Sequence, residues 1–241
     1  MKVLIKRGGC PPGARAAGQR VSLDADEVHH LRVRRAKDGE AVEVLDGEGL
    51  RGTGRLVQDG KQWAVQIQSL DHEARPAELT LAVAAGDRER FTWMVEKAAE
   101  LGVTRIVPLE TAHTAGVASR LKQAHLEKLR RAASEAIKQC GAAWAPSVEE
   151  LVPLEEYARR SLQGEGWLAD IAGAAPPVGL DRTPVSAVVG PEGGLTDAER
   201  KALLLAGYRP VALGRHTLRF ETAALAAAAA MAQARMRGLN G

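Results

Sequence analysis

The chain has 241 residues, of which 45% are hydrophobic and 26% charged, and this profile excludes intrinsic disorder, collagen and a disulfide scaffold. The net charge is +3, and the only cysteines, Cys10 and Cys140, indicate free thiols in a reducing compartment. The longest apolar stretch, residues 223–232, is shorter than the ~20 residues of a membrane-spanning helix, and no secretory signal is recognisable. We therefore expect a cytoplasmic protein that does not enter a membrane.

The excess of positive over negative charge comes entirely from the first third of the chain. Residues 1–70 hold 12 Lys and Arg against 9 Asp and Glu, whereas residues 71–241 hold 21 of each. A local group, Arg32, Arg34, Arg35 and Lys37, suits contacts with nucleic-acid phosphates, although a solvated helix face gives the same count. With only eight aromatic residues, a broad base-stacking platform is not expected.

Residues 1–70 predict a small β-barrel with one helix. The helix is expected after Asp24, a candidate N-cap with Glu27 three residues later. Short runs that alternate apolar and polar residues, or that end at turn signals, predict strands at residues 3–5, 19–23, 41–45, 51–57 and 62–70.

The polar segment 71–78 predicts a linker, and residues 79–241 predict a second domain in which strands and helices alternate. The expected strands are residues 79–84, 104–109, 166–170, 185–189 and 209–213. The expected helices are residues 89–101, 120–139, 153–162, a segment capped by Thr196 with Glu199, and 221–237. This alternation indicates a parallel sheet covered on both faces.

Two glycine-bearing loops follow two of these strands, at residues 190–194 and 213–222. Ligands of open α/β sheets bind at the carboxyl ends of strands, so two such loops together indicate a binding site, whereas either alone reads as an ordinary turn. The P-loop, the GxGxxG fingerprint, the GxSxG elbow and zinc-ligand spacings are all missing, and no metal site is expected. His29 and His30 suit packing, while His216 lies within the second loop.

Three motifs give the chain a resemblance to a known family: EKAAELGV at residues 96–103, VGPEGGLTDAE at 189–199 and LGRHTLRFETAAL at 213–225. They resemble the ribosomal RNA small-subunit methyltransferase E family, which methylates N3 of one uridine in 16S rRNA. The resemblance implies a PUA-like RNA-binding barrel followed by an α/β SPOUT domain with a C-terminal trefoil knot. It also implies S-adenosylmethionine as cofactor, 16S rRNA or the small ribosomal subunit as substrate, and a homodimer.

The candidate site residues fall in three groups. Arg219 is expected to stabilise the developing anion on uracil, and Glu192 and Glu221 are the candidate proton acceptors, although Glu221 also suits a helix cap and Glu192 also suits a loop-shaping role. The implied cofactor-binding residues are Leu168, Val189, Gly190, Pro191, Glu192, Gly193, Gly194, Leu213, Gly214, Leu218, Glu221, Thr222 and Ala223. The candidate RNA-binding residues, chosen for the excess of positive charge in residues 1–70, are Arg7, Arg32, Arg34, Arg35 and Lys37.

The chain departs from the family pattern at Arg215, His216, Phe220 and Ala142, which concerns the fine contacts with RNA and cofactor more than the reaction class. Two alternatives stay open from the sequence. One is a methyltransferase of the same fold acting on a tRNA base or a ribose 2′-hydroxyl. The other is an RNA-binding or ribosome-assembly protein without catalytic activity.

Overall fold

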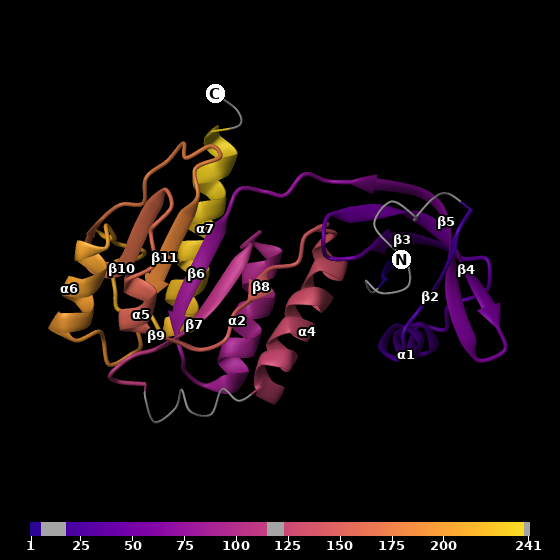
Figure 1. The fold of residues 1–241 in the computed structure, drawn as a ribbon, viewed down its shortest axis with the longest axis horizontal. Coiled ribbons are helices and arrows are strands. Elements are labelled where there is room, and N and C mark those ends of the chain that lie inside the picture. The colour runs from indigo at the N-terminus through magenta and orange to yellow at the C-terminus, as the bar shows by residue number, and fades with distance from the viewer. Residues whose placement is uncertain (6–17, 115–122, 239–241) are drawn as a thin grey trace. The chain divides into compact units, whose positions relative to one another are not determined.

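The computed structural model describes residues 1–5, 18–114 and 123–238, and it divides the chain into two compact units (Figure 1). Unit 1 comprises residues 1–75 and 137–145, and unit 2 comprises residues 76–136 and 146–241. Two details differ from the expected division into residues 1–70, 71–78 and 79–241. Strand β5 (Gln62–His72) extends into the expected linker, and residues 137–145 belong with the N-terminal unit. Cys10 and Arg7 lie outside the described residues.

Unit 1 is a five-stranded sheet with one helix. The strand order is β1 (Lys2–Leu4), β3 (Ala41–Leu45), β4 (Leu50–Asp59), β5 and β2 (Arg20–Ser22). Only the β1–β3 pair among these neighbours is parallel. Helix α1 (Ala25–Val33) begins as predicted, because the Asp24 carboxylate accepts a hydrogen bond from the Glu27 amide at 2.8 Å. Alternate strand residues and Leu31 of α1 form its core.

Residues 137–145 attach to unit 1 by specific polar contacts. Lys138 Nζ lies 2.6 Å from Glu27 Oε1, and both side chains are more than nine-tenths buried. The Ala145 amide donates to the Gly47 carbonyl, and Trp144 Nε1 donates to the Glu73 carbonyl. A buried ion pair is costly when one partner is removed, so this segment is an integral part of the unit.

Unit 2 contains a parallel seven-stranded sheet. The order is β12 (Arg209–Val211), β10 (Glu165–Ala174), β11 (Val185–Val189), β6 (Leu79–Ala84), β7 (Arg105–Glu110) and β8 (Ser147–Val148), with β9 (Val152–Pro153) also pairing with β7. Every pairing is parallel, as the alternating pattern predicted.

Two apolar layers cover this sheet, one on each face. Leu79, Leu81 and Val83 of β6 point toward α2 (Arg88–Glu100), α4 (Gln123–Cys140) and α7 (Phe220–Gly238). Ala82, between them, faces the layer of α5 (Leu154–Ala158) and α6 (Asp197–Leu205). Because strand side chains alternate, a continuous apolar strand serves both layers. The trefoil knot implied by the resemblance stays a prediction.

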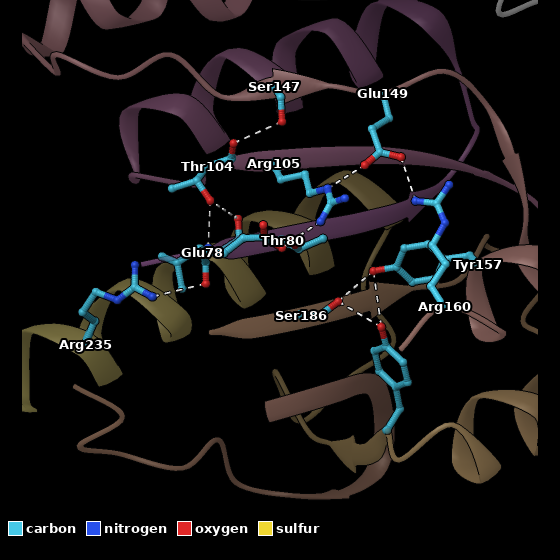
Figure 2. A network of polar contacts seen from close by, with 12 residues as sticks. Glu78, Thr80, Thr104, Arg105, Ser147, Glu149, Tyr157, Arg160, Ser186 and Arg235 are labelled. Atoms are coloured by element: carbon cyan, nitrogen blue, oxygen red, sulfur yellow. Dashed lines mark hydrogen bonds and ion pairs between the residues drawn. The ribbon is translucent and has the colours of Figure 1, made fainter. Parts of the chain in front are cut away.

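The amino ends of the unit 2 strands carry a network of paired polar side chains (Figure 2). Arg105 contacts Glu78 at 2.9 Å and Glu149 at 2.5 Å, and Glu149 also pairs with Arg160 at 2.7 Å. Tyr157 and Ser186 are hydrogen-bonded at 2.8 Å, and Ser186 also contacts the Tyr208 hydroxyl at 3.0 Å. Burial raises the pKa of the Tyr157 hydroxyl above its ordinary value, so Tyr157 stays neutral. These side chains hold the edge of the sheet together.

Candidate cofactor site

A cavity lies at the opposite edge of the same sheet, where the carboxyl ends of β10, β11 and β12 meet. Its volume is about 320 Å³, and its wall is formed by residues 168–171 of β10, by the loops that follow β11 and β12, and by Arg200. The lining residues are Leu168, Ala169, Asp170, Ile171, Val189, Gly190, Pro191, Glu192, Gly194, Leu195, Arg200, Leu213, Gly214, His216, Thr217, Leu218, Phe220 and Ala223. Clefts at the carboxyl ends of parallel strands are where α/β proteins bind their ligands.

The first glycine loop needs its glycines for close packing and for turn geometry. A Cβ atom on Gly190 would lie 3.1 Å from the Leu195 side chain. Gly194 has φ +74°, and its amide closes a turn by donating to the Pro191 carbonyl at 2.9 Å. The loop then enters α6 through the predicted capping box of Thr196 and Glu199.

Glu199 joins this loop to the segment that follows β7. One carboxylate oxygen accepts hydrogen bonds from the amide and hydroxyl of Thr196, and the other accepts the Ala112 amide at 2.8 Å. Burial alone would raise the pKa of Glu199, but the bonds from Ala112 and Thr196 hold the pKa below its ordinary value. Glu199 is therefore a buried carboxylate that joins the loop after β11 to the segment after β7.

Most of the sequence-predicted cofactor residues meet in this cavity. Ten line it: Leu168, Val189, Gly190, Pro191, Glu192, Gly194, Leu213, Gly214, Leu218 and Ala223. Gly193, Glu221 and Thr222 are not among the lining residues. Gly193 instead lies against His113, and Thr222 is exposed on α7. Their assignment as cofactor ligands stays a prediction.

The three predicted catalytic residues occupy different surroundings. Glu192 lines the cavity, and Arg219 is exposed between the lining residues Leu218 and Phe220. Glu221 is only 8% exposed, and its Oε1 lies 3.4 Å from Arg90 Nη1 of α2. Glu221 thus ties the start of α7 to α2, a contact different from the helix cap considered for it from the sequence.

The cavity also contains polar residues that sequence reasoning missed. Asp170 follows the buried part of β10 and forms an ion pair with Arg200 of α6. Asp170 carried a usable signal, because it is a charged residue at the end of an apolar strand run. Arg200 carried none, since one arginine on an amphipathic helix is ordinary. Phe220, one of the departures from the family pattern, stacks on Phe91 with ring centroids 6.2 Å apart.

The predicted RNA-binding residues that the structure describes are exposed on unit 1. Arg32, Arg34, Arg35 and Lys37 all face solvent at the end of α1 and just beyond it. Arg32 donates a hydrogen bond to the Lys61 carbonyl at 3.2 Å. The group therefore forms one exposed basic surface, while Arg7 lies outside the described residues.

Comparisons with known proteins agree with this geometry. A family described as an RNA methyltransferase domain matches residues 73–232, and one described as an RNA methyltransferase PUA domain matches residues 23–68. The fold and the cavity thus belong to an RNA methyltransferase that carries a PUA domain. This confirms the expected PUA-type domain and α/β methyltransferase domain, while the trefoil knot stays a prediction.

Similarity to individual relatives identifies the family within the RNA methyltransferases. The ribosomal RNA small subunit methyltransferase E of Synechocystis sp. is 30% identical over 214 residues, which cover 84% of this chain and 69% of the relative. The Neisseria gonorrhoeae enzyme of that name, solved with S-adenosyl methionine, is 30% identical with a TM-score of 0.76, covering 94% of this chain and 95% of the other. A Legionella pneumophila methyltransferase solved with the same cofactor is 26% identical with a TM-score of 0.78, covering 97% and 98%. The chain belongs to the ribosomal RNA small subunit methyltransferase E family.

No helix in the described part of the chain is long and apolar enough to cross a membrane. Within the same residues, no cluster of three or more His, Cys, Asp or Glu side chains could hold a metal ion.

Proposed function

We propose that this protein transfers the methyl group of S-adenosylmethionine to N3 of a uridine in 16S ribosomal RNA. The observation that carries the proposal is the cavity formed by β10 and the two glycine-bearing loops in a chain of this family. The Neisseria gonorrhoeae relative, solved with S-adenosyl methionine, supports the choice of cofactor.

The cavity fits such a cofactor by size and by lining. Its volume of about 320 Å³ lies within the usual range for small-molecule sites. Three lining glycines, Gly190, Gly194 and Gly214, leave backbone atoms open to a ligand, and Leu168, Val189 and Leu213 supply apolar contacts. When bound, S-adenosylmethionine supplies an electrophilic methyl group on a positively charged sulfur.

The protein's own residues have to handle a proton and a developing charge. Uracil N3 carries a weakly acidic proton, and its removal leaves negative charge spread over O2 and O4. Arg219, exposed at the rim, is proposed to donate hydrogen bonds to that charge. Glu192 is the better placed proton acceptor because it lines the cavity, whereas Glu221 is engaged by Arg90.

The substrate uridine must be unpaired or flipped out, because N3 lies on the pairing edge of the base. The basic surface of unit 1, formed by Arg32, Arg34, Arg35 and Lys37, is proposed to hold the surrounding RNA by its phosphates. A ribosomal RNA substrate supports our proposal that the protein acts in the cytoplasm.

A homodimer is also proposed. Trp93 on α2 is 47% exposed, and several residues of the alanine-rich helix α7, such as Leu225 and Ala229, stay partly exposed. An exposed large apolar side chain on one helix and partly exposed small residues on another are features that suit packing between two copies. Sedimentation as a monomer at micromolar concentration would contradict it.

The decisive experiment maps the methylated nucleoside. Small ribosomal subunits from a strain lacking the gene are incubated with purified protein and labelled S-adenosylmethionine, and the product is located by nuclease digestion and mass spectrometry. We expect label at one uridine, as N3-methyluridine. Label in tRNA or on a ribose would support the alternative substrates, and absence of cofactor binding by calorimetry would support a non-catalytic protein.

A companion experiment tests the basic surface. Each lost phosphate contact lowers the slope of RNA affinity against salt by about 0.7–0.9. Replacing Arg32 and Arg35 together by Ala should therefore weaken RNA binding and flatten its salt dependence, with unchanged affinity for S-adenosylmethionine. Unchanged RNA binding would show that unit 1 does not dock the substrate through these residues.

A further inference from the structure

A short turn after β7 presents one histidine to the cofactor loop. The Thr111 amide donates to Thr114 Oγ1 at 2.9 Å, and the Thr114 amide donates to the Thr111 carbonyl at 3.0 Å. Both threonine side chains are buried, so the turn is fixed at each end. His113, between them, is exposed.

His113 contacts the loop at its two glycines. Its Nδ1 atom lies 2.8 Å from the Gly194 carbonyl oxygen. A Cβ atom placed on Gly193 would lie 3.4 Å from the imidazole, so the ring packs directly against that backbone. The amide of the preceding residue, Ala112, donates a hydrogen bond to Glu199 of α6. The turn therefore contacts both the loop and the helix that follows it.

The chemistry of the two groups determines which of them donates the hydrogen bond between His113 and Gly194. A carbonyl oxygen can only accept, so His113 Nδ1 must carry the hydrogen. This holds for the neutral Nδ1–H tautomer and for the imidazolium alike. The contact therefore depends on a donor at that atom and not on the charge of the ring.

We propose that His113 is a positioning residue that holds the loop 191–194 in its ligand-binding conformation. The inference rests on the proposed function, because it assigns the loop to the cofactor. Because Gly193 and Gly194 are consecutive glycines, ordering the loop costs a large conformational entropy. Pro191, Glu192 and Gly194 of this loop line the cavity. A tether present before binding removes part of that cost, which raises affinity without touching the ligand.

Four variants separate the hydrogen bond from packing. His113→Ala removes both, and the net value of a hydrogen bond predicts an affinity for S-adenosylmethionine about 3- to 10-fold lower by calorimetry. His113→Asn should restore most of it, because its amide nitrogen is the same number of bonds from Cα as Nδ1. His113→Gln places the amide one bond further away and should not, and His113→Phe keeps only the ring. Equal affinity in all four, or an Asn variant as weak as Ala, would overturn the proposal.

Hydrogen exchange measures the same tether without any cofactor. Amides of residues 192–195 should exchange faster in the Ala and Gln variants than in the wild type and the Asn variant. Unchanged exchange would overturn the proposal. If the wild type itself fails to bind S-adenosylmethionine, the proposed function fails while this measurement still reports on the tether.

A pH profile distinguishes positioning from proton transfer. Because the contact survives in both protonation states, the Asn variant should keep the wild-type shape of single-turnover methylation against pH. Loss of an ionisation from that profile would overturn the positioning role in favour of proton transfer at Nε2.

Discussion

The two edges of the unit 2 sheet use polar residues in opposite ways. At the amino ends of the strands, Arg105, Glu149 and Arg160 satisfy one another, as do the hydroxyls of Tyr157 and Ser186 (Figure 2). At the carboxyl ends, glycines and exposed side chains surround a cavity of about 320 Å³. Mutually paired groups stabilise a fold, whereas backbone and side-chain groups left open in a concave site are available to a ligand. Mutations at the two edges should therefore separate stability from function.

The largest effect is expected for Arg219→Ala at the cavity rim. Loss of a donor to a developing anion costs about 10²- to 10³-fold in rate. Single-turnover methylation with saturating RNA and cofactor should fall by that factor, while RNA affinity changes little. A normal rate would remove Arg219 from the catalytic residues even in a working enzyme.

The next effect concerns cofactor binding. In Gly214→Val, branched methyl groups would enter the cavity, although the Cβ itself fits at 3.5 Å from Leu218. The wild type should gain about 2.7 kcal/mol of stability at a cofactor concentration of 100 times Kd, and the variant should gain none. Thermal denaturation with and without S-adenosylmethionine measures both. Gln163→Val, at the opposite edge, is the matched control and should keep the full gain.

A smaller effect of the opposite kind is expected for Tyr157→Phe. The variant removes one hydroxyl from a buried group of three and leaves Ser186 and Tyr208 less well paired. We expect a loss of about 1–2 kcal/mol in unfolding free energy, and about 2–4 °C in Tm per kcal/mol. Cofactor affinity should be unchanged by calorimetry. A weaker affinity would mean that the two edges are coupled.

The smallest effect is a pH dependence that the edges share for different reasons. Burial would raise the pKa of Glu149, but hydrogen bonds from Arg160 and Arg105 hold it below its ordinary value. Burial would likewise raise the pKa of Glu199, but hydrogen bonds from Ala112 and Thr196 hold it below its ordinary value. A depressed folded pKa gives stability that is present above the ordinary value of about 4.5 and lost as pH falls through the folded value. Glu149→Gln should remove up to about 1 kcal/mol of that acid-sensitive stability, as for a partly exposed ion pair. Glu199→Gln should weaken cofactor binding as well, whereas Glu149→Gln should leave cofactor binding unchanged. Urea titrations between pH 3 and 7 test the first statement, and calorimetry at neutral pH tests the second.

Local patterns predicted the elements of the fold well. Asp24 and Thr196 cap helices as expected, and the apolar run 185–189 is a buried strand. The helix expected at residues 153–162 is shorter, because α5 ends at Ala158 and polar residues follow. The attachment of residues 137–145 to unit 1 rests on contacts between residues far apart in the chain, such as Lys138 and Glu27, 111 positions apart, and these leave no local signal.

The site was predictable where a motif carried it and unpredictable where only tertiary contacts did. The glycine loops were found because glycine patterns follow strands in the sequence. The Asp170–Arg200 pair and the His113–Gly194 contact were missed, since each joins segments far apart in the chain. Glu221 was found from its motif, but the motif does not reveal that its carboxylate pairs with Arg90.

The last helix of unit 2 covers its first strand, and this has a consequence for biosynthesis. Ala224, Ala227 and Ala228 of α7 share one apolar layer with Leu79 and Leu81 of β6, and Arg235 donates hydrogen bonds to the carbonyls of Ala77 and Glu78. During translation, residues 79–84 emerge roughly 140 positions before their covering helix, which at about 5–20 residues per second is a delay of several seconds or more. Unit 2 therefore cannot finish folding on the translating ribosome until α7 has been made. A nascent chain that stops short of α7 would expose an apolar sheet face, a substrate for chaperones and a starting point for aggregation.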